Sequence, residues 1–391
     1  MQTRFKPRQL VAEESALRVE WGDGHWSRYH HIWLRDACRC PKCGEPAFGD
    51  KKIVLSALPA KLQLRSHYIS NEGAIVVTWD HDEHESAFSG QWLRRHCYSK
   101  SERVARRFEP VLWHGENPPD VSPFALPALL DSEAHQYEML ERLHRVGIAF
   151  VEQVPAQAGV RLVGELIGFL RETNYGREYD IKVEPVPRTF ADLPESAPLH
   201  TDDAFRPFPP GFTMLHCVQP SVDGRGASIF LDGFDTVERL RAQSPAAVEM
   251  LSRLPLRFSR HHPDEHDFAF QGQLIRLDPE GNVAGVRLGL HNISPPDIDE
   301  DDVEPFYDAL KRLDRLIRTP ALRIVRRLAA GELALVDNER VLHGRESFDG
   351  RGGRHIRGAF VDRDAFHSRW RVLSQRLGHD ENKYLVFPGG R

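Results

Sequence analysis

Two potential metal ligands stand one residue apart in the segment Leu199-His-Thr-Asp-Asp-Ala-Phe205. Alternate side chains share a face of an extended backbone, so His200 and Asp202 can hold the same metal ion. The best candidate for a third ligand is His343. Two histidines and one carboxylate form the facial triad that leaves open positions on Fe(II). Such a centre constrains the fold, because His200 and His343 lie far apart in the sequence and would have to meet.

A second pair with the same spacing, His262-Pro-Asp264, is the rival for this role. Its proline and its polar neighbours indicate a solvated loop. A further residue favours the first pair, because Arg354 follows His343 in a segment suited to a strand, Arg354-His-Ile-Arg-Gly-Ala-Phe360. An arginine fork is what the distal carboxylate of a five-carbon diacid requires.

These spacings, with the motif Asp337-Asn-x-Arg-x-x-His-Gly-Arg345, resemble the Fe(II)- and 2-oxoglutarate-dependent dioxygenases of the taurine dioxygenase superfamily. Within it the chain is most similar to the γ-butyrobetaine hydroxylase and trimethyllysine hydroxylase family, over nearly its whole length. The resemblance implies Fe(II) on His200, Asp202 and His343, and O₂ as an oxidant. It also implies 2-oxoglutarate, a cosubstrate, on Arg354 and Ser228. The expected fold is mainly β with flanking helices: a double-stranded β-helix, or jelly roll, plus a small N-terminal zinc-binding β domain.

The resemblance also implies where a substrate would lie. A trimethylammonium group cannot donate hydrogen bonds and is recognised by aromatic faces. Three aromatic residues match the cage positions of the γ-butyrobetaine hydroxylases, namely Tyr175, Tyr179 and Phe360. The chain departs from the family at Arg188-Thr-Phe-Ala-Asp192 and at His291-Asn292, where the acidic end of the substrate would bind. The candidate contacts for that end are Arg188, Arg287, His291 and Asn292.

The expected reaction is hydroxylation of a small quaternary ammonium compound, either γ-butyrobetaine to carnitine or a close analogue. The changed anion-binding positions leave one alternative substrate class, a trimethylammonium compound with a different acidic end such as 2-(trimethylamino)ethylphosphonate. Two other classes of function are also open. One is a non-enzymatic ligand-binding protein, and the other is an adaptor that binds partners through its N-terminal domain. Succinate release that depends on iron and 2-oxoglutarate would exclude both.

Three cysteines, Cys38, Cys40 and Cys43, lie close together in the sequence. Three thiolates require a fourth ligand to close a tetrahedral zinc site. The family resemblance implies His84, with His96 and Cys97 as the alternatives. A closed zinc site is structural, so we assign it no chemistry.

The composition narrows the choice of partners and compartment. A net charge of −5 over 391 residues gives no reason to expect nucleic acid, and no apolar run is long enough to span a membrane. The N-terminus lacks the apolar region of a secretory signal. Five cysteines, three of them clustered, fit metal binding in a reducing, cytoplasmic compartment. A homodimer is expected by resemblance alone.

We expect three segments: an N-terminal zinc-binding β domain over residues 1–110, a proline-rich linker over 111–128 and the jelly-roll domain over 129–391. Alternation predicts strands at 17–21, 75–79 and 147–151. Helical spacing predicts helices at 132–146, with Ser132 as the cap, and at 159–172, 303–316 and 363–377. About eight strands should form two facing sheets.

Overall fold

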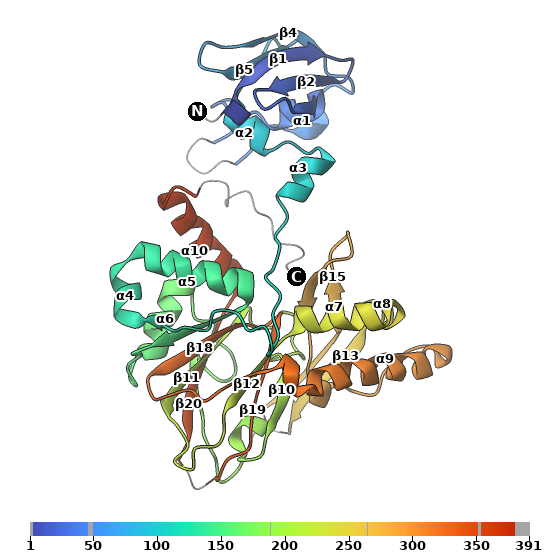
Figure 1. Cartoon of the computed structure of the whole chain (residues 1–391). Coiled ribbons are helices and arrows are strands. Elements are labelled where there is room, and N and C mark those ends of the chain that lie inside the picture. The colour runs from blue at the N-terminus through green and yellow to red at the C-terminus, as the bar shows by residue number, and fades with distance from the viewer. Residues whose placement is uncertain (1–2, 46–49, 188, 264, 351–352, 380–391) are drawn as a thin grey trace. The chain divides into compact units, whose positions relative to one another are not determined.

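The computed structural model describes residues 3–45, 50–187, 189–263, 265–350 and 353–379 (Figure 1). The contacts of the chain divide it between Phe108 and Glu109 into two compact units. The domain limits predicted from the sequence, at 110 and 128, stay a prediction.

The N-terminal unit consists of two three-stranded antiparallel sheets with short helices. The first sheet contains β1 (Pro7–Ala12), β2 (Ala16–Trp21) and β3 (Trp26–His30), and the second contains β4 (Leu64–Ile69), β5 (Ala74–Trp79) and β6 (Glu85–Ser89). The helices are α1 (His31–Asp36), α2 (Gly90–Arg95) and α3 (Lys100–Ala105). The strands predicted at 17–21 and 75–79 are therefore confirmed as β2 and β5. The indoles of Trp21 and Trp79 are fully buried, and each donates a hydrogen bond to a serine.

The second unit is built on a six-stranded and a four-stranded sheet (Figure 1). The larger sheet has the order β7 (Phe124–Ala125), β8 (Ile148–Glu152), β18 (Glu332–Asp337), β11 (Phe212–Gln219), β20 (His355–Val361) and β9 (Glu178–Ile181). The smaller has the order β10 (Ala197–His200), β19 (Val341–Arg345), β12 (Ser228–Asp232) and β17 (Ile324–Arg326).

The two sheets face each other across a shared core. The ring of Phe150 on β8 packs edge-on against that of Phe230 on β12, with their centroids 5.7 Å apart. Side chains from both sheets, including Cys217, Val336 and Val341, complete this cluster. The predicted jelly roll is confirmed, with six and four strands rather than about eight in total.

Helices and two hairpins surround the sheets. The helices are α4 (Leu126–Asp131), α5 (Glu133–Val146), α6 (Gly159–Ile167), α7 (Gly233–Gln243), α8 (Pro245–Arg253), α9 (Glu300–Arg318) and α10 (Arg363–Arg376). The hairpins pair β13 (Leu256–His262) with β14 (His266–Gly272), and β15 (Ile275–Leu277) with β16 (Val283–Val286). In Figure 1, α5 and α6 lie against the larger sheet, whereas α7, α8 and α9 pack together with the hairpins.

The predicted helices are present, with one clear difference in length. Ser132 caps α5 as expected, because its hydroxyl accepts a hydrogen bond from the backbone of His135. The helix predicted to reach residue 172 ends at Ile167. The C-cap is Gly168, and Leu170 then forms a β-bridge with Val361 on β20.

The proline-rich segment contributes to the second unit. Trp113 is almost fully buried in the core shared by the two sheets. Its indole donates to the carbonyl of Val146, and its backbone N–H donates to the carboxylate of Asp232. These contacts anchor the approach to the jelly roll before β7 begins.

Candidate functional site

The structure brings the three predicted iron ligands together. His200 is the last residue of β10, and β10 pairs with β19 so that His200 stands opposite His343. Nε2 of His200 lies 3.3 Å from one carboxylate oxygen of Asp202, and Nε2 of His343 lies 3.3 Å from the other. One ligand atom from each residue lies within 4.8 Å of the others. Asp202 lies in the turn that follows β10, rather than on the extended strand that the His-x-Asp spacing predicts.

Neighbouring side chains hold Asp202 in place. The hydroxyl of Thr213 donates to its carboxylate at 2.8 Å. The amide of Asn338 clamps its backbone, accepting from the N–H at 2.6 Å and donating to the carbonyl at 3.1 Å. Burial opposes ionisation of Asp202, but His343 and His200 hold its pKa well below the ordinary value. The carboxylate is therefore an oriented anion.

The imidazoles present the donor atoms that a metal requires. Nδ1 of His200 lies 2.8 Å from the carbonyl of Pro198, which can only accept, so Nδ1 carries the proton and Nε2 is left as the ligand. Among the described residues, the buried Nδ1 of His343 has no hydrogen-bond partner. Two Nε2 atoms and a carboxylate oxygen thus face one small space, which fits a two-histidine, one-carboxylate iron centre.

Arg354 is a buried cation for which the described residues supply no anion. It directly precedes β20 and is 9% exposed. No carboxylate or carbonyl in the described part of the chain pairs with its guanidinium, which lies 5.6 Å from the ring of Phe348. Burial lowers the pKa of Arg354 to about 10, although Cys217 opposes this change. A buried guanidinium that lacks an anionic partner among the described residues can bind an incoming carboxylate such as that of 2-oxoglutarate.

A second arginine, Arg345, shares the ring of Phe348 with Arg354, at 4.7 Å. It differs because its guanidinium donates to the backbone carbonyls of Leu193 and Glu195. Ser228, the other predicted cosubstrate contact, is buried on β12 directly opposite Arg345. Its hydroxyl forms no hydrogen bond to Arg354 in the described structure.

The three predicted cage residues form a continuous aromatic cluster. The ring of Tyr179 lies 5.8 Å from that of Tyr175 and 5.2 Å from that of Phe360. Phe360 is the cross-strand neighbour of Thr213, the residue that binds Asp202. Burial raises the pKa of Tyr175 to about 12 and that of Tyr179 well above its ordinary value, so both phenols stay protonated.

Two of the four predicted anion contacts lie beside the triad or close to it. The ring of His291 is 5.5 Å from that of His200 and 5.3 Å from that of Phe190. Partial burial, followed by His200 and Arg260, lowers the pKa of His291. Asn292 follows at the end of the same helical turn. Arg188 lies outside the described residues.

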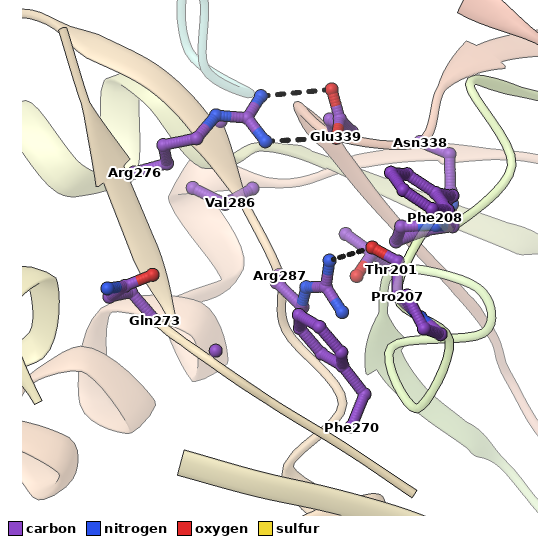
Figure 2. A pocket seen from close by; sticks show the side chains of 13 residues that line it. Thr201, Pro207, Phe208, Phe270, Gln273, Arg276, Val286, Arg287, Asn338 and Glu339 are labelled. Carbon is purple, nitrogen blue, oxygen red and sulfur yellow. Dashed lines mark hydrogen bonds and ion pairs between the residues drawn. The ribbon is translucent and has the colours of Figure 1, made fainter. Parts of the chain in front are cut away.

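Arg287 has a different setting from the one expected of a substrate contact. Its guanidinium donates to the carbonyls of Ala204 at 2.9 Å, Arg206 at 2.6 Å and Pro207 at 3.2 Å, and it stacks over Phe270. Arg287 lines a cavity (Figure 2) with a volume of about 220 Å³, and none of the three iron-ligand candidates belongs to that lining. Arg287 therefore fastens the loop that follows Asp202.

The cysteine cluster of the N-terminal unit converges on His84. Nε2 of His84 lies 3.4 Å from Sγ of Cys38, 3.6 Å from that of Cys40 and 3.4 Å from that of Cys43. Arg35 donates to Sγ of Cys43 and to Asp82, whose carboxylate accepts from the backbone of His84. Three thiolates and one imidazole at these distances fit a closed zinc site.

The alternative zinc ligands point elsewhere. Nδ1 of His96 lies 2.7 Å from the carbonyl of Trp92, and its ring packs at a tilt against that indole, with the centroids 4.0 Å apart. Sγ of Cys97 lies 3.4 Å from Nε2 of His25.

The rival pair of iron ligands was His262 and Asp264, and Asp264 is outside the described residues. Among those described, His262 joins no group of metal-ligating side chains.

Sequence reasoning missed some residues that shape the site. Asn338 belongs to the motif ahead of His343, so its place in the motif was a usable signal. Thr213 lies on a buried strand, where nothing in the pattern distinguishes it from a core residue. Arg260 faces the aromatic cluster from β13, and its neighbours in the sequence suggested only a polar loop.

The fold and the site define a class, the mononuclear iron oxygenases with a jelly-roll core. Residues 89–360 match the sequence profile described as "Taurine catabolism dioxygenase TauD, TfdA family", and residues 8–94 match "Gamma-butyrobetaine hydroxylase-like, N-terminal". The chain belongs to this dioxygenase family and, within it, to the γ-butyrobetaine and trimethyllysine hydroxylase group.

Individual relatives support this assignment. The chain is 34% identical to the γ-butyrobetaine dioxygenase of Pseudomonas sp. (strain AK-1), over 92% of this chain and 94% of the relative. It is 31% identical to that of Homo sapiens, over 92% and 95%. It is 27% identical to the trimethyllysine dioxygenase of Meyerozyma guilliermondii, over 92% and 94%. The protein is thus an enzyme of the dioxygenase class, and no described helix is both long and apolar enough for a membrane span.

Proposed function

We propose that this protein is an Fe(II)- and 2-oxoglutarate-dependent hydroxylase of a small trimethylammonium compound, with γ-butyrobetaine, which would yield carnitine, as the first candidate. The observation that carries this function is the convergence of His200, Asp202 and His343, together with the buried cation of Arg354, which has no anionic partner among the described residues. Relatives more than 30% identical are named γ-butyrobetaine dioxygenases, which supports this substrate. They do not favour the phosphonate alternative, 2-(trimethylamino)ethylphosphonate.

The protein positions the metal through residues with distinct roles. His200 and His343 would bind Fe(II) through Nε2, and Asp202 through a carboxylate oxygen. When bound with 2-oxoglutarate and O₂, the iron supplies the oxidant that converts an unactivated C–H bond to C–OH. Thr213 and Asn338 keep the carboxylate of Asp202 turned toward the two imidazoles. Such outer contacts raise metal affinity because they fix the ligands before the metal arrives.

Arg354 would bind the distal carboxylate of 2-oxoglutarate, with the Ser228 hydroxyl as a second donor. The guanidinium has no competing anion in the described structure and lies where water has little access. A charge-assisted, two-pronged hydrogen bond is stronger in such a place than in water. The cosubstrate is thereby oriented, because the arginine would take the distal carboxylate and leave the 2-oxo acid end for the metal ligands' side of the site.

The aromatic cluster would hold the trimethylammonium group. Tyr175, Tyr179 and Phe360 can offer ring faces, which attract a cation that has no hydrogen to donate. Phe360 neighbours Thr213 and hence Asp202, so a substrate held by the cluster has its carbon chain near the metal ligands. The rings thus supply both affinity and position.

The function is tested by turnover of the iron-loaded protein with 2-oxoglutarate and three substrates: γ-butyrobetaine, trimethyllysine and the trimethylammonium phosphonate. We expect succinate release coupled to a product heavier by one oxygen, strongest with γ-butyrobetaine. His343→Ala is the control and should release no succinate. Coupled turnover of the phosphonate alone would move the assignment to that substrate, and absence of succinate with all three would overturn the proposal.

Three further assignments accompany this function. Cys38, Cys40, Cys43 and His84 would hold a structural zinc ion. A homodimer and a cytoplasmic location are expected from the family resemblance and the composition. We expect neither nucleic acid nor membrane as a partner. Light scattering of the purified protein would test the dimer, and metal analysis of it would test the zinc.

A further inference from the structure

The loop that carries Asp202 is fastened through its backbone carbonyls. We call residues 201–210, which follow β10, the metal loop. The amide of Asn338 donates to carbonyls near its two ends, that of Asp202 at 3.1 Å and that of Pro210 at 3.0 Å. The guanidinium of Arg287 donates to carbonyls in its middle. Side chains from other segments therefore hold the backbone of this loop, and with it the carboxylate of Asp202.

Arg171 fastens the same loop from the side of the aromatic cluster. Its guanidinium donates to the carbonyl of Phe208 at 2.7 Å and to that of Pro209 at 3.1 Å. It also pairs with the carboxylate of Asp362 at 2.9 Å. The backbone N–H of Arg171 donates to the carbonyl of Phe360 at 2.8 Å. Arg171 thus ties the backbone of one residue of the aromatic cluster to the metal loop.

A tight turn at residues 173–176, which we call the cage turn, carries another ring of the cluster, that of Tyr175. The backbones of Thr173 and Gly176 exchange hydrogen bonds of 3.1 and 2.9 Å. The N–H of Tyr175 donates to the hydroxyl of Thr173 at 3.1 Å. Gly176 has a φ of 88°, in the left-handed region that favours glycine. The turn therefore presents Asn174 and Tyr175 at its tip.

Arg206 reaches the cage turn from the metal loop. Its Nη2 donates to the side-chain oxygen of Asn174, which directly precedes Tyr175. Its Nε donates at 2.6 Å to the carboxylate of Asp203, which directly follows Asp202. The side chains of Arg206 and Asp203 are only 14% and 6% exposed, so water competes little for that end of the bridge. One guanidinium therefore joins the neighbour of a candidate iron ligand to the neighbour of a cluster ring.

We propose that Arg171 and Arg206 are positioning residues that hold the aromatic cluster at a fixed distance from Asp202 and thereby determine which carbon of the substrate is oxidised. This assignment rests on the proposed function and deepens it. A ring face attracts a quaternary ammonium group without fixing its direction, because such a cation has no N–H to aim. The placement of the substrate chain at the iron then depends on how rigidly the rings are held to the metal loop. A displacement of about 1 Å is enough to slow such a reaction by roughly 100-fold.

The test follows turnover of γ-butyrobetaine by the iron- and 2-oxoglutarate-loaded protein, with ascorbate as the reductant that uncoupled turnover consumes. Succinate and hydroxylated product are both measured, because their ratio does not depend on how much of the protein is folded. Asn174→Ala removes one end of the bridge at an exposed position and keeps the ion pair between Arg206 and Asp203. It should lower kcat/KM about 2- to 10-fold, which is the worth of one hydrogen bond. The product formed per succinate should fall below about half of the wild-type value, because a misplaced substrate escapes oxidation.

Three more variants separate positioning from support of the fold. Asn174→Asp keeps an acceptor for Arg206 and should restore both measurements. Arg206→Met removes both ends of the bridge and should lower kcat/KM roughly 10- to 100-fold. Adding Asn174→Ala to Arg206→Met should have no further effect, because the two residues act through one hydrogen bond. Arg171→Met should lower the product formed per succinate in the same way as Asn174→Ala.

Arg177→Met is the matched control, because Arg177 lies in the same segment, is exposed and pairs with Glu172 at 3.2 Å. It should change neither kcat/KM nor the product formed per succinate. Variants of Arg171, Asn174 and Arg206 that lose activity but keep the wild-type ratio of product to succinate would overturn the inference, since the arginines would then only support the fold. A wild-type protein that forms no hydroxylated product would instead overturn the proposed function.

Discussion

Replacing Arg354 by methionine should separate binding of the cosubstrate from stability of the fold. Burial lowers the pKa of Arg354 from the ordinary 12.5 to about 10. At neutral pH, below both values, the charge is present in the folded and the unfolded chain but is disfavoured in the folded one. Each pH unit of difference corresponds to about 1.4 kcal/mol, so the charge destabilises the ligand-free fold by about 3 kcal/mol. The destabilisation would fade only as the pH rises through the folded-state value.

Arg354→Met removes this charge and keeps much of the side-chain volume, so the ligand-free variant should be at least as stable as the wild type. Binding of 2-oxoglutarate should weaken by about 2–5 kcal/mol, because a buried carboxylate loses its partner. The assay measures thermal unfolding with and without 2-oxoglutarate, together with the dissociation constant. The wild type should gain stability with cosubstrate concentration, whereas the variant should not respond at the same concentrations.

Arg357→Met is the control, because Arg357 lies on the same strand but forms an ion pair with Asp180 at 3.0 Å. That variant should keep its affinity for 2-oxoglutarate and lose, at most, a little stability. The reasoning would be refuted if Arg354→Met bound 2-oxoglutarate as tightly as the wild type. A ligand-free Arg354→Met protein much less stable than the wild type would refute the energetic part alone.

Two further substitutions test the supports of the metal sites. Asn338→Ala removes the two hydrogen bonds to the backbone of Asp202. It should lower iron affinity about 10- to 100-fold, measured by competition with a chelator. Iron affinity equal to that of the wild type would show that Thr213 alone is sufficient to orient Asp202. His84→Ala should remove zinc, measured as metal per chain, and expose the N-terminal unit to protease, whereas full zinc content would point to a different fourth ligand.

The parts of the site that could be predicted are those whose chemistry is rare and whose spacing is short. His200 and Asp202 form a recognisable pair, and the clustered cysteines indicate a metal by themselves. His343 could not be identified as a ligand from local spacing, because it meets His200 only through the pairing of β10 with β19. The order of strands in a jelly roll is set by long-range pairing that no local pattern encodes. The family resemblance supplied that order, and periodicity alone would not have done so.

Helix boundaries show the same limit at a smaller scale. The start of α5 could be predicted because Ser132 caps it through a local hydrogen bond. The end of α6 was placed too late, because beyond the Gly168 cap Leu170 pairs with Val361, which is distant in the sequence. A boundary such as the start of α5 is fixed by a local hydrogen bond, whereas a boundary such as the end of α6 also involves tertiary contacts.

The arginines of the site can be sorted by the partners that the fold gives them. Arg340 is almost fully buried and pairs with the carboxylate of Asp232 at 2.8 Å, so its charge is already neutralised. Arg287 and Arg345 spend their donors on carbonyls of neighbouring loops, which fixes those loops but leaves the positive charge. Arg354 has neither kind of partner in the described chain, so a ligand must supply one. Equivalent residue types in the sequence thus become a core ion pair, a loop anchor or a binding group according to which oxygen atoms the backbone brings within reach. This is why the sequence identified several of these arginines as notable but could not assign Arg287 its partners.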